Sequence, residues 1–235
     1  MKLSRNFSVK VLYVLDQWVP PIMRDSKWFM IVPLKLVLKH NARDFMTFKD
    51  WVFKSTDKEF GDLYERTALP QELQGETDLN EACLNEILKR VKGKRVLEVG
   101  CGRGLLADKL SAKNKVTGCD IVVSDTVRKN YPAVKFVAGN IENLPFKDKS
   151  FDVVVTTHTL EHVKDLPTAV KELRRIAKEE LIIVVPKQRP YKYGFSLHTQ
   201  FFPYEWSLQG AFGYIKGKTT IKNLDGDWFY RQKMQ

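Results

Sequence analysis

The sequence predicts an α/β fold in which helices cover both faces of a doubly wound, mostly parallel sheet. Apolar runs rich in Val, Ile and Leu recur between residues 95 and 186, and segments with helical periodicity separate them. Runs without polar alternation are typical of strands buried on both faces, and helical connections between them favour parallel pairing. The hydrophobic share of 43% and the charged share of 29% are those of an ordinary folded domain.

The predicted elements follow one another in a regular order. A helix is expected first, at 78–91, where apolar side chains share one stripe. Strands are then expected at 95–100, 115–122, 134–139, 151–157 and 181–186, with helices at 103–112, 124–131 and 166–179. The tail at 213–234 has β-branched and aromatic residues around Gly217 and Asp225-Gly226, which predicts an antiparallel hairpin and a sheet of seven strands.

The chain is expected to divide into an extension at 1–77 and an α/β domain at 78–235. The extension is basic, rich in Trp and broken by prolines, so we expect short helices there. The net charge of +11 lies at the ends of the chain: residues 1–40 carry +5, residues 187–235 carry +5, and the 146 residues between them carry +1. An anionic partner would therefore meet the ends of the chain.

The cysteines and the N-terminus indicate a cytoplasmic protein. Cys83, Cys101 and Cys119 have no C-x-x-C spacing, so neither a disulfide framework nor a metal site is expected. A secretory signal is not indicated, because Asp16 and Gln17 interrupt the first apolar segment. No apolar stretch reaches the roughly 18 residues that a membrane-spanning helix needs.

Three glycines lie within five positions in RVLEVGCGRGLLADKL, residues 95–110. In a doubly wound sheet, ligands bind beyond the carboxyl ends of the strands, and the loop after the first strand lies closest. Gly100, Gly102 and Gly104 would let this loop turn tightly and approach a ligand. Their spacing is not that of the dinucleotide fingerprint, and no Lys-Ser/Thr pair follows to form a P-loop. Asp120, which ends the second strand, can accept hydrogen bonds from both hydroxyls of a ribose.

Five motifs occur in order along this region: EVGCGRG, GCD, GNIENLPF, SFDVVV and TLEHV. With them, residues 78 to about 186 resemble the class I S-adenosylmethionine-dependent methyltransferases. The resemblance implies a Rossmann-like methyltransferase fold and S-adenosyl-L-methionine as the cofactor. It also implies that Gly100 and Gly102 pack against the methionine part of the cofactor, that Glu98 anchors its amino end, and that Asp120 holds its ribose. A cap of the following helix is the alternative role for Asp120.

The resemblance assigns the adenine and methyl ends of the cofactor to other residues. Ile121 would lie on the adenine face, and Ile141 would supply a backbone donor to the ring. Asn140 stands where the family usually has Asp, and its amide oxygen can still accept from the adenine amino group. Thr157 would border the sulfonium, while Cys101 lies in the loop and has the alternative of a small filler. The implied cofactor contacts are Glu98, Gly100, Cys101, Gly102, Asp120, Ile121, Asn140, Ile141 and Thr157.

Methyl transfer from a sulfonium is an in-line displacement that requires alignment rather than a metal or a nucleophilic triad. A base is useful when the acceptor is a hydroxyl or a protonated amine, and histidine suits this task near pH 7. His158, directly after the fourth strand, and His198, in the aromatic connection at 189–206, are the candidate catalytic residues. Tyr191, Tyr193, Phe201 and Phe202 of that connection are candidate walls of an acceptor pocket, with a hydrophobic lid anchor as the alternative.

The acceptor is expected to be a small molecule, a sugar or a lipid-linked compound, methylated at oxygen. Residues 156–159 read TTHT instead of the N/D-P-P-Y/F motif of amino-group methylation, and no cysteine follows the fourth or fifth strand as cytosine chemistry would need. These features disfavour nucleic-acid substrates.

Residues 1–40 suit a helix at an anionic membrane surface, which would make the protein peripherally membrane-associated, or else a cap over the active site. Two further alternatives stay open: a tRNA or rRNA methyltransferase that uses the basic termini, and a non-catalytic cofactor-binding adaptor.

Overall fold

A computed structural model describes residues 14, 18–67 and 77–234 of the chain. The chain divides into two compact units: Met1–Gly75 with Gln188–Phe201, and Glu76–Lys187 with Phe202–Gln235. The sequence-based division at 77/78 placed residues 188–201 in the α/β domain, whereas in the structure they pack within the first unit.

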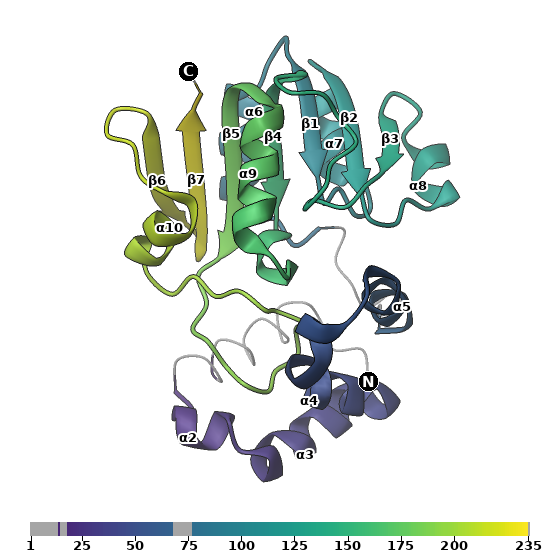
Figure 1. The fold of residues 1–235 in the computed structure, drawn as a ribbon, viewed down its shortest axis with the longest axis vertical. Coiled ribbons are helices and arrows are strands. Elements are labelled where there is room, and N and C mark those ends of the chain that lie inside the picture. Colours follow the sequence, from purple (N-terminus) through teal and green to yellow (C-terminus); the bar gives the residue numbers. More distant parts are fainter. Residues whose placement is uncertain (1–13, 15–17, 68–76, 235) are drawn as a thin grey trace. The chain divides into compact units, whose positions relative to one another are not determined.

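The second unit is built on a seven-stranded sheet of order β3-β2-β1-β4-β5-β7-β6 (Figure 1). The strands are β1 (Arg95–Val99), β2 (Lys115–Asp120), β3 (Lys135–Ala138), β4 (Phe151–Thr157), β5 (Ala177–Pro186), β6 (Thr219–Leu224) and β7 (Asp227–Lys233). Strands β1 to β5 pair in parallel, and β7 is antiparallel to both β5 and β6. The predicted doubly wound, mostly parallel sheet with a C-terminal hairpin is confirmed. Asp225 and Gly226 form the hairpin turn with φ of 48° and 90°, the positive values that a tight turn of this kind requires.

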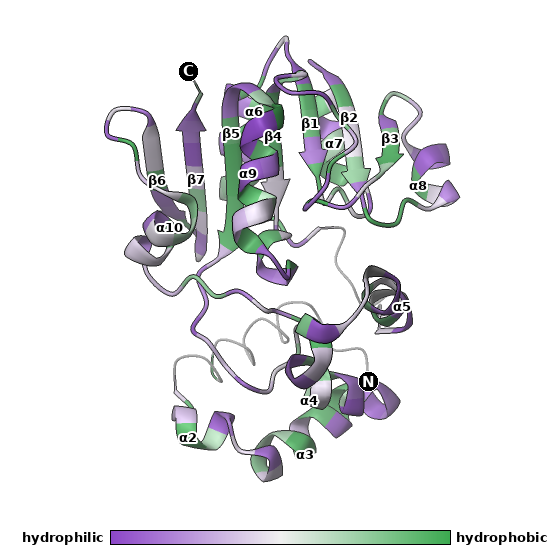
Figure 2. Ribbon diagram, viewed as in Figure 1, coloured by the Kyte–Doolittle hydropathy of each residue, from purple (hydrophilic) through white to green (hydrophobic). Residues whose placement is uncertain are grey.

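Helices cover both faces of this sheet. Helices α6 (Glu81–Arg90), α7 (Leu105–Ser111) and α8 (Asp125–Asn130) pack on one face, and α9 (Leu166–Ile176) and α10 (Glu205–Phe212) on the other (Figure 1). Alternate residues of β5 serve the two cores: Leu181, Ile183 and Val185 face α9, while Ile182 and Val184 face the opposite side. Because both faces are covered, residues 181–185 of β5 are all apolar, as the green stretch of this strand in Figure 2 shows.

One predicted boundary is wrong. The helix expected at 166–179 ends at Ile176, and β5 begins at Ala177. Ala177 pairs with Phe151 of β4, and Glu180 pairs with Lys233 of β7. These ladder partners extend the backbone through a polar segment whose sequence is also compatible with a helix.

The first unit consists of short helices and the 188–201 segment. Its elements are α2 (Pro21–Arg24), α3 (Lys27–Leu38), η1 (Lys39–Asn41), α4 (Ala42–Trp51), η2 (Val52–Lys54) and α5 (Asp57–Thr67). Residues from α3, α4 and α5 form a small core that Tyr193 and Leu197 complete. The predicted N-terminal helical part is therefore present. Among the described residues, no helix combines the length and the apolar character needed to cross a bilayer.

Candidate active site

The loop after β1 curls over the end of β2. The backbone N–H groups of Gly100 and Cys101 both donate to the carbonyl of Cys119, at 2.8 and 3.1 Å. The backbone N–H of Gly102 donates to Asp120 Oδ2 at 2.7 Å. The structure thus brings the glycine loop and the predicted ribose ligand together at the carboxyl ends of β1 and β2, where doubly wound sheets bind their ligands.

Two glycines of this loop have positive φ for different reasons. Gly100 has a φ of 73°, and a Cβ atom there would lie 2.0 Å from Thr159 Oγ1. Gly102 has a φ of 48°, and a Cβ atom there would meet no atom of the described residues within 4 Å. Glycine is therefore required at position 100 because a side chain there would overlap Thr159 in the loop after β4. Gly102 instead faces open space that a ligand can use.

Glu98, in β1, is a buried carboxylate at 3% exposure. Its Oε2 atom has no hydrogen-bond partner among the residues that the structure describes. Burial, and then the charge of Asp120, raise the pKa of the Glu98 carboxyl well above its usual value, while a hydrogen bond from the backbone of Ala107 opposes the rise. An ammonium group beside Oε2 would give this oxygen a partner and stabilise the ionised carboxylate. The amino end of S-adenosyl-L-methionine carries such a group, so the residue fits that cofactor.

Asp120 ends β2 beside the glycine loop. Burial raises the pKa of its carboxyl, and hydrogen bonds from the backbone of Gly102, Val122 and Ile121 oppose this rise. The Ile121 side chain is 41% exposed, which is compatible with a place on an adenine face. Ser124 caps α8 through its side chain. The alternative in which Asp120 caps that helix is therefore not what the structure shows, and Asp120 instead holds the loop in place.

The segment after β3 contains the residues predicted to meet adenine. The backbone N–H of Gly139 donates to the carbonyl of Asp120 at 2.8 Å, which ties this segment to β2. Asn140 Oδ1 accepts from the backbone N–H of Glu142 at 2.9 Å, and an amide oxygen has two lone pairs, so a further hydrogen bond is compatible with this turn. The Ile141 side chain is buried in the core on the α9 side of the sheet. Both adenine contacts stay predictions.

His158 lies between two carboxylates directly after β4. Its Nε2 is 3.1 Å from Asp227 Oδ2, and its Nδ1 is 3.4 Å from Glu161 Oε1. Burial lowers the pKa of His158, but the hydrogen bonds and charges of Asp227 and Glu161 outweigh it and raise the pKa to about 10. The ring is then charged at neutral pH, with both nitrogens donating. A general base needs a lone pair, so His158 would first have to lose a proton that two carboxylates hold.

The partners of His158 connect the loop after β4 to distant parts of the second unit. Asn80 Nδ2 donates to Asp227 Oδ2 at 2.8 Å and to the carbonyl of Leu224 at 2.9 Å. Asn80 Oδ1 accepts from the backbone N–H of Cys83, which caps α6. A single polar cluster therefore joins this loop, the β6–β7 hairpin and the start of α6.

Sequence reasoning assigned no role to either partner of His158. Glu161 follows it by three residues, a spacing that could have served as a signal. Asp227 is 69 residues away and looks like an ordinary turn residue, so only the strand order brings it close. Thr157 ends β4, and its carbonyl accepts from Thr159 Oγ1 at 3.0 Å. The expected position of Thr157 beside the sulfonium stays a prediction.

His198 belongs to the first unit. Its Nδ1 lies 2.7 Å from Gln188 Oε1. Because an amide oxygen accepts, Nδ1 is the donor, and a neutral His198 carries its lone pair on Nε2. The ring centroid lies 6.5 Å from that of Tyr191 and 6.4 Å from that of Phe201. His198 is thus set in an aromatic cluster of the 188–201 segment, and its catalytic role stays a prediction.

The four aromatic residues predicted to wall an acceptor pocket do not share one environment. Tyr193 is buried in the core of the first unit. Phe202 is 2% exposed in the core of the second unit, where its carbonyl accepts from Trp228 Nε1 at 2.8 Å. Tyr193 and Phe202 therefore serve packing, while Tyr191 and Phe201 contact each other edge to face at 4.9 Å within the first unit.

Comparisons with known proteins identify the family and the fold of this domain. Residues 97–185 match the methyltransferase domain family. The demethylmenaquinone methyltransferase of Staphylococcus epidermidis is 29% identical over 160 residues, which are 57% of this chain and 66% of that relative. The demethylmenaquinone methyltransferase of Bacillus licheniformis is 26% identical over 144 residues, with 57% and 61% covered. The match spans less than two thirds of either relative.

A solved structure shows the same fold over most of the chain. It is an S-adenosylmethionine-dependent methyltransferase of Thermotoga maritima, with a TM-score of 0.53 and 20% identity, and the match covers 82% of this chain and 100% of that chain. The family match, the shared fold and the cofactor loop agree on one assignment. Residues 97–185 of the chain belong to a class I S-adenosylmethionine-dependent methyltransferase domain, with S-adenosyl-L-methionine as its cofactor.

Proposed function

We propose that the chain transfers the methyl group of S-adenosyl-L-methionine to a small-molecule or lipid-linked acceptor, at an oxygen atom. The observation that supports the transfer activity is a group of residues at the carboxyl ends of β1 and β2 that fits the cofactor. It combines the orphaned carboxylate of Glu98, the carboxylate of Asp120 and the open face of Gly102. Keeping a buried, unpartnered carboxylate is costly, which supports a site that is completed by a cationic ligand rather than a decayed pocket.

Each residue of the site has a separate task in this proposal. Glu98 holds the ammonium group, Asp120 holds the ribose hydroxyls, and Asn140 accepts from the adenine amino group. Gly102 leaves room for the methionine part. When bound, the cofactor supplies a methyl group on a positively charged sulfur. The residues of the site would align this methyl group with the acceptor oxygen for an in-line displacement and would keep water away.

The acceptor hydroxyl loses its proton in the transfer, and His198 is the candidate residue to receive it. Histidine suits this task near pH 7, and the hydrogen bond between His198 Nδ1 and Gln188 Oε1 fixes the ring within the first unit. His158 is better suited to holding the loop after β4, because it is an imidazolium between Glu161 and Asp227.

Two observations support the acceptor class. The two relatives are named for methylation of demethylmenaquinone, a small molecule. The TTHT sequence at residues 156–159 lacks the motif of amino-group methylation, which favours oxygen.

The experiment that tests the proposal uses the full chain, ¹³C-methyl-labelled cofactor and a fractionated lysate. We expect label in the lipid or small-molecule fraction, with the carbon chemical shift of an O-methyl group. Glu98→Gln is the matched control, because it keeps the size of the side chain and removes the charge that the ammonium group needs. It should bind the cofactor weakly in equilibrium dialysis and transfer no label. Label in RNA or protein would contradict the acceptor class, and cofactor binding without any transfer would contradict the activity.

A further inference from the structure

Helix α3 is apolar on nearly all sides. Its sequence, KWFMIVPLKLVL, contains two lysines and no acidic residue. Met30, Leu34 and Leu38 recur every four residues, are at most 7% exposed and lie in the core of the first unit. A helix of this composition is normally buried all round, in a large core or in contact with a membrane.

The other face of α3 is open to solvent. Trp28, Val32 and Leu36 also recur every four residues, so they share a face nearly opposite the buried one. Their exposed fractions are 87%, 57% and 77%. The row from Trp28 to Leu36 spans about 12 Å at the rise of an α-helix. Single exposed apolar residues are common in folded proteins, but a continuous row of large ones marks an interaction surface.

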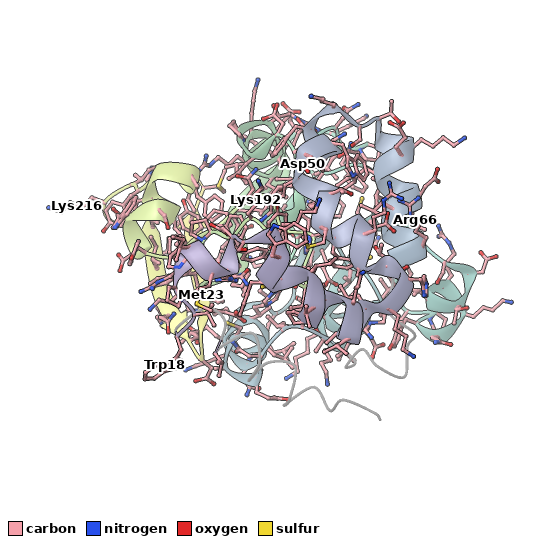
Figure 3. The ribbon with its side chains drawn as sticks, turned by 90° about the horizontal axis from the view of Figure 1, so that it is seen from below. Trp18, Met23, Asp50, Arg66, Lys192 and Lys216 are labelled. Atoms are coloured by element: carbon pink, nitrogen blue, oxygen red, sulfur yellow. The ribbon has the colours of Figure 1, made fainter. Side chains whose placement is uncertain are left out.

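Further exposed apolar residues lie in α2 and just before it. Ile22 and Trp18 are 84% and 76% exposed, and Met23 is 43% exposed. Figure 3 labels Trp18 and Met23, and the Trp18 side chain projects away from the ribbon. The backbone N–H of Ser26 donates to the carbonyl of Met23 at 3.0 Å, which connects α2 directly to the start of α3. We call Trp18, Ile22, Met23, Trp28, Val32 and Leu36 the α2–α3 surface.

The charges beside this surface are almost all positive. Lys27, Lys35, Lys39 and Arg43 are exposed. The acidic residue in the same stretch is Asp25, and its carboxylate already has a partner in the first unit. Its Oδ1 accepts a hydrogen bond from the backbone N–H of Lys192 at 2.6 Å. Large apolar side chains flanked by lysines are typical of helices at a membrane surface, because lysine stems lie along apolar groups while the ammonium reaches the headgroups.

We propose that the α2–α3 surface docks on a bilayer that contains anionic lipids. Trp28, Val32 and Leu36 enter the boundary between headgroups and acyl chains, and the flanking cations contact anionic headgroups. Helix α3 lies in the membrane plane, since it has 12 residues and cannot span the bilayer. This inference goes beyond methyl transfer and does not depend on it.

The test is co-sedimentation of the full chain with vesicles of phosphatidylcholine alone or with added phosphatidylglycerol. We expect binding to the anionic vesicles, weak binding to the neutral ones, and a loss of affinity as salt rises. Trp28→Ser combined with Leu36→Ser should reduce binding at least tenfold, because it removes two large apolar side chains from the contact. Trp206→Ser is the matched control: Trp206 is 68% exposed on α10 of the second unit, and its replacement should leave binding unchanged.

A second variant tests the charge separately. Lys35→Glu combined with Lys39→Glu should reduce binding to anionic vesicles and leave binding to neutral ones almost unchanged. Wild-type chain that stays in the supernatant, or a Trp28→Ser/Leu36→Ser variant that binds as wild type does, would overturn the proposal. The proposal would also be overturned if the chain self-associated in the absence of vesicles and the Trp28→Ser/Leu36→Ser variant did not. Binding of the wild type to tRNA but not to vesicles would overturn it as well. Cofactor affinity, measured in parallel, should be the same in all four proteins, which separates this proposal from the proposed enzymatic function.

Discussion

Strand β5 and helix α3 both contain apolar runs, but the run in β5 is buried on both faces, whereas α3 is buried on one face only. Residues 181–185 of β5 are all 0% exposed, because α9 covers one face of the strand and helices of the opposite layer cover the other. In α3, Leu34 is 0% exposed while Leu36, two residues later, is 77% exposed. An apolar run is therefore completely buried only where other elements of the chain pack against both of its faces. Where they pack against one face, the other face stays exposed and can bind a partner.

The largest effect is expected where the second unit is packed most tightly. Gly100→Val should lower the free energy of unfolding by about 3 to 5 kcal/mol, because the new Cβ would overlap Thr159 in a left-handed backbone. Gly102→Val should cost only about 1 to 2 kcal/mol of backbone strain, since nothing described lies near its Cβ, but it should abolish cofactor binding. Urea unfolding and calorimetric cofactor titration measure the two effects. Equal losses of unfolding free energy in the two variants would contradict the inference that Gly100 is needed for packing and Gly102 for ligand binding.

The next prediction compares two leucines on opposite faces of α3. Leu34→Ala should lower the free energy of unfolding by about 3 kcal/mol, because it leaves a cavity in the core of the first unit. Leu36→Ala should change it by less than about 0.5 kcal/mol, as expected for an exposed site. The same substitution in the same helix controls for helix propensity. Similar losses for both variants would mean that the exposed face of α3 is covered in solution.

The smallest effect concerns pH. The ionisation of one residue in each unit should change the free energy of unfolding in opposite directions as the pH rises. The pKa of His158 is raised from 6.5 to about 10, so its stabilising contribution is complete below pH 6.5 and is lost as the pH rises towards 10. The wild type should therefore lose stability relative to His158→Gln as the pH rises through this range. Chemical unfolding at a series of pH values measures the difference. A parallel pH dependence in the two proteins would show that Glu161 and Asp227 do not hold the proton on His158.

Lys49 of the first unit provides the opposite sign. Burial lowers the pKa of Lys49 to about 8, against 10.5 in an unfolded chain, and the charge of Asp25 offsets part of this. Its Nζ lies 3.9 Å from the centroid of the Tyr191 ring. The folded state therefore binds fewer protons than the unfolded state between pH 8 and 10.5, so this residue makes the protein more stable as the pH rises. Lys49→Met should remove that gain, whereas His158→Gln should leave it intact.

The sequence by itself determined the sheet and the cofactor loop, because both depend on short-range signals. Uninterrupted apolar runs marked the central strands, and Asp225-Gly226 marked the hairpin. The glycines at 100 and 102, with Asp120, marked the ligand end of the sheet. Each of these patterns is local to one strand or one turn, so local backbone geometry is enough to recognise it.

Only the tertiary structure decided which distant residues meet. Asp227 reaches His158 because β7 pairs with β5, which in turn pairs with β4, and no local pattern encodes that order. The end of α9 at Ile176 depends on ladder partners in β4 and β7. The buried face of α3 could not be predicted from the sequence either. A helix that is apolar on nearly all sides has no hydrophobic periodicity to indicate which face packs against the core.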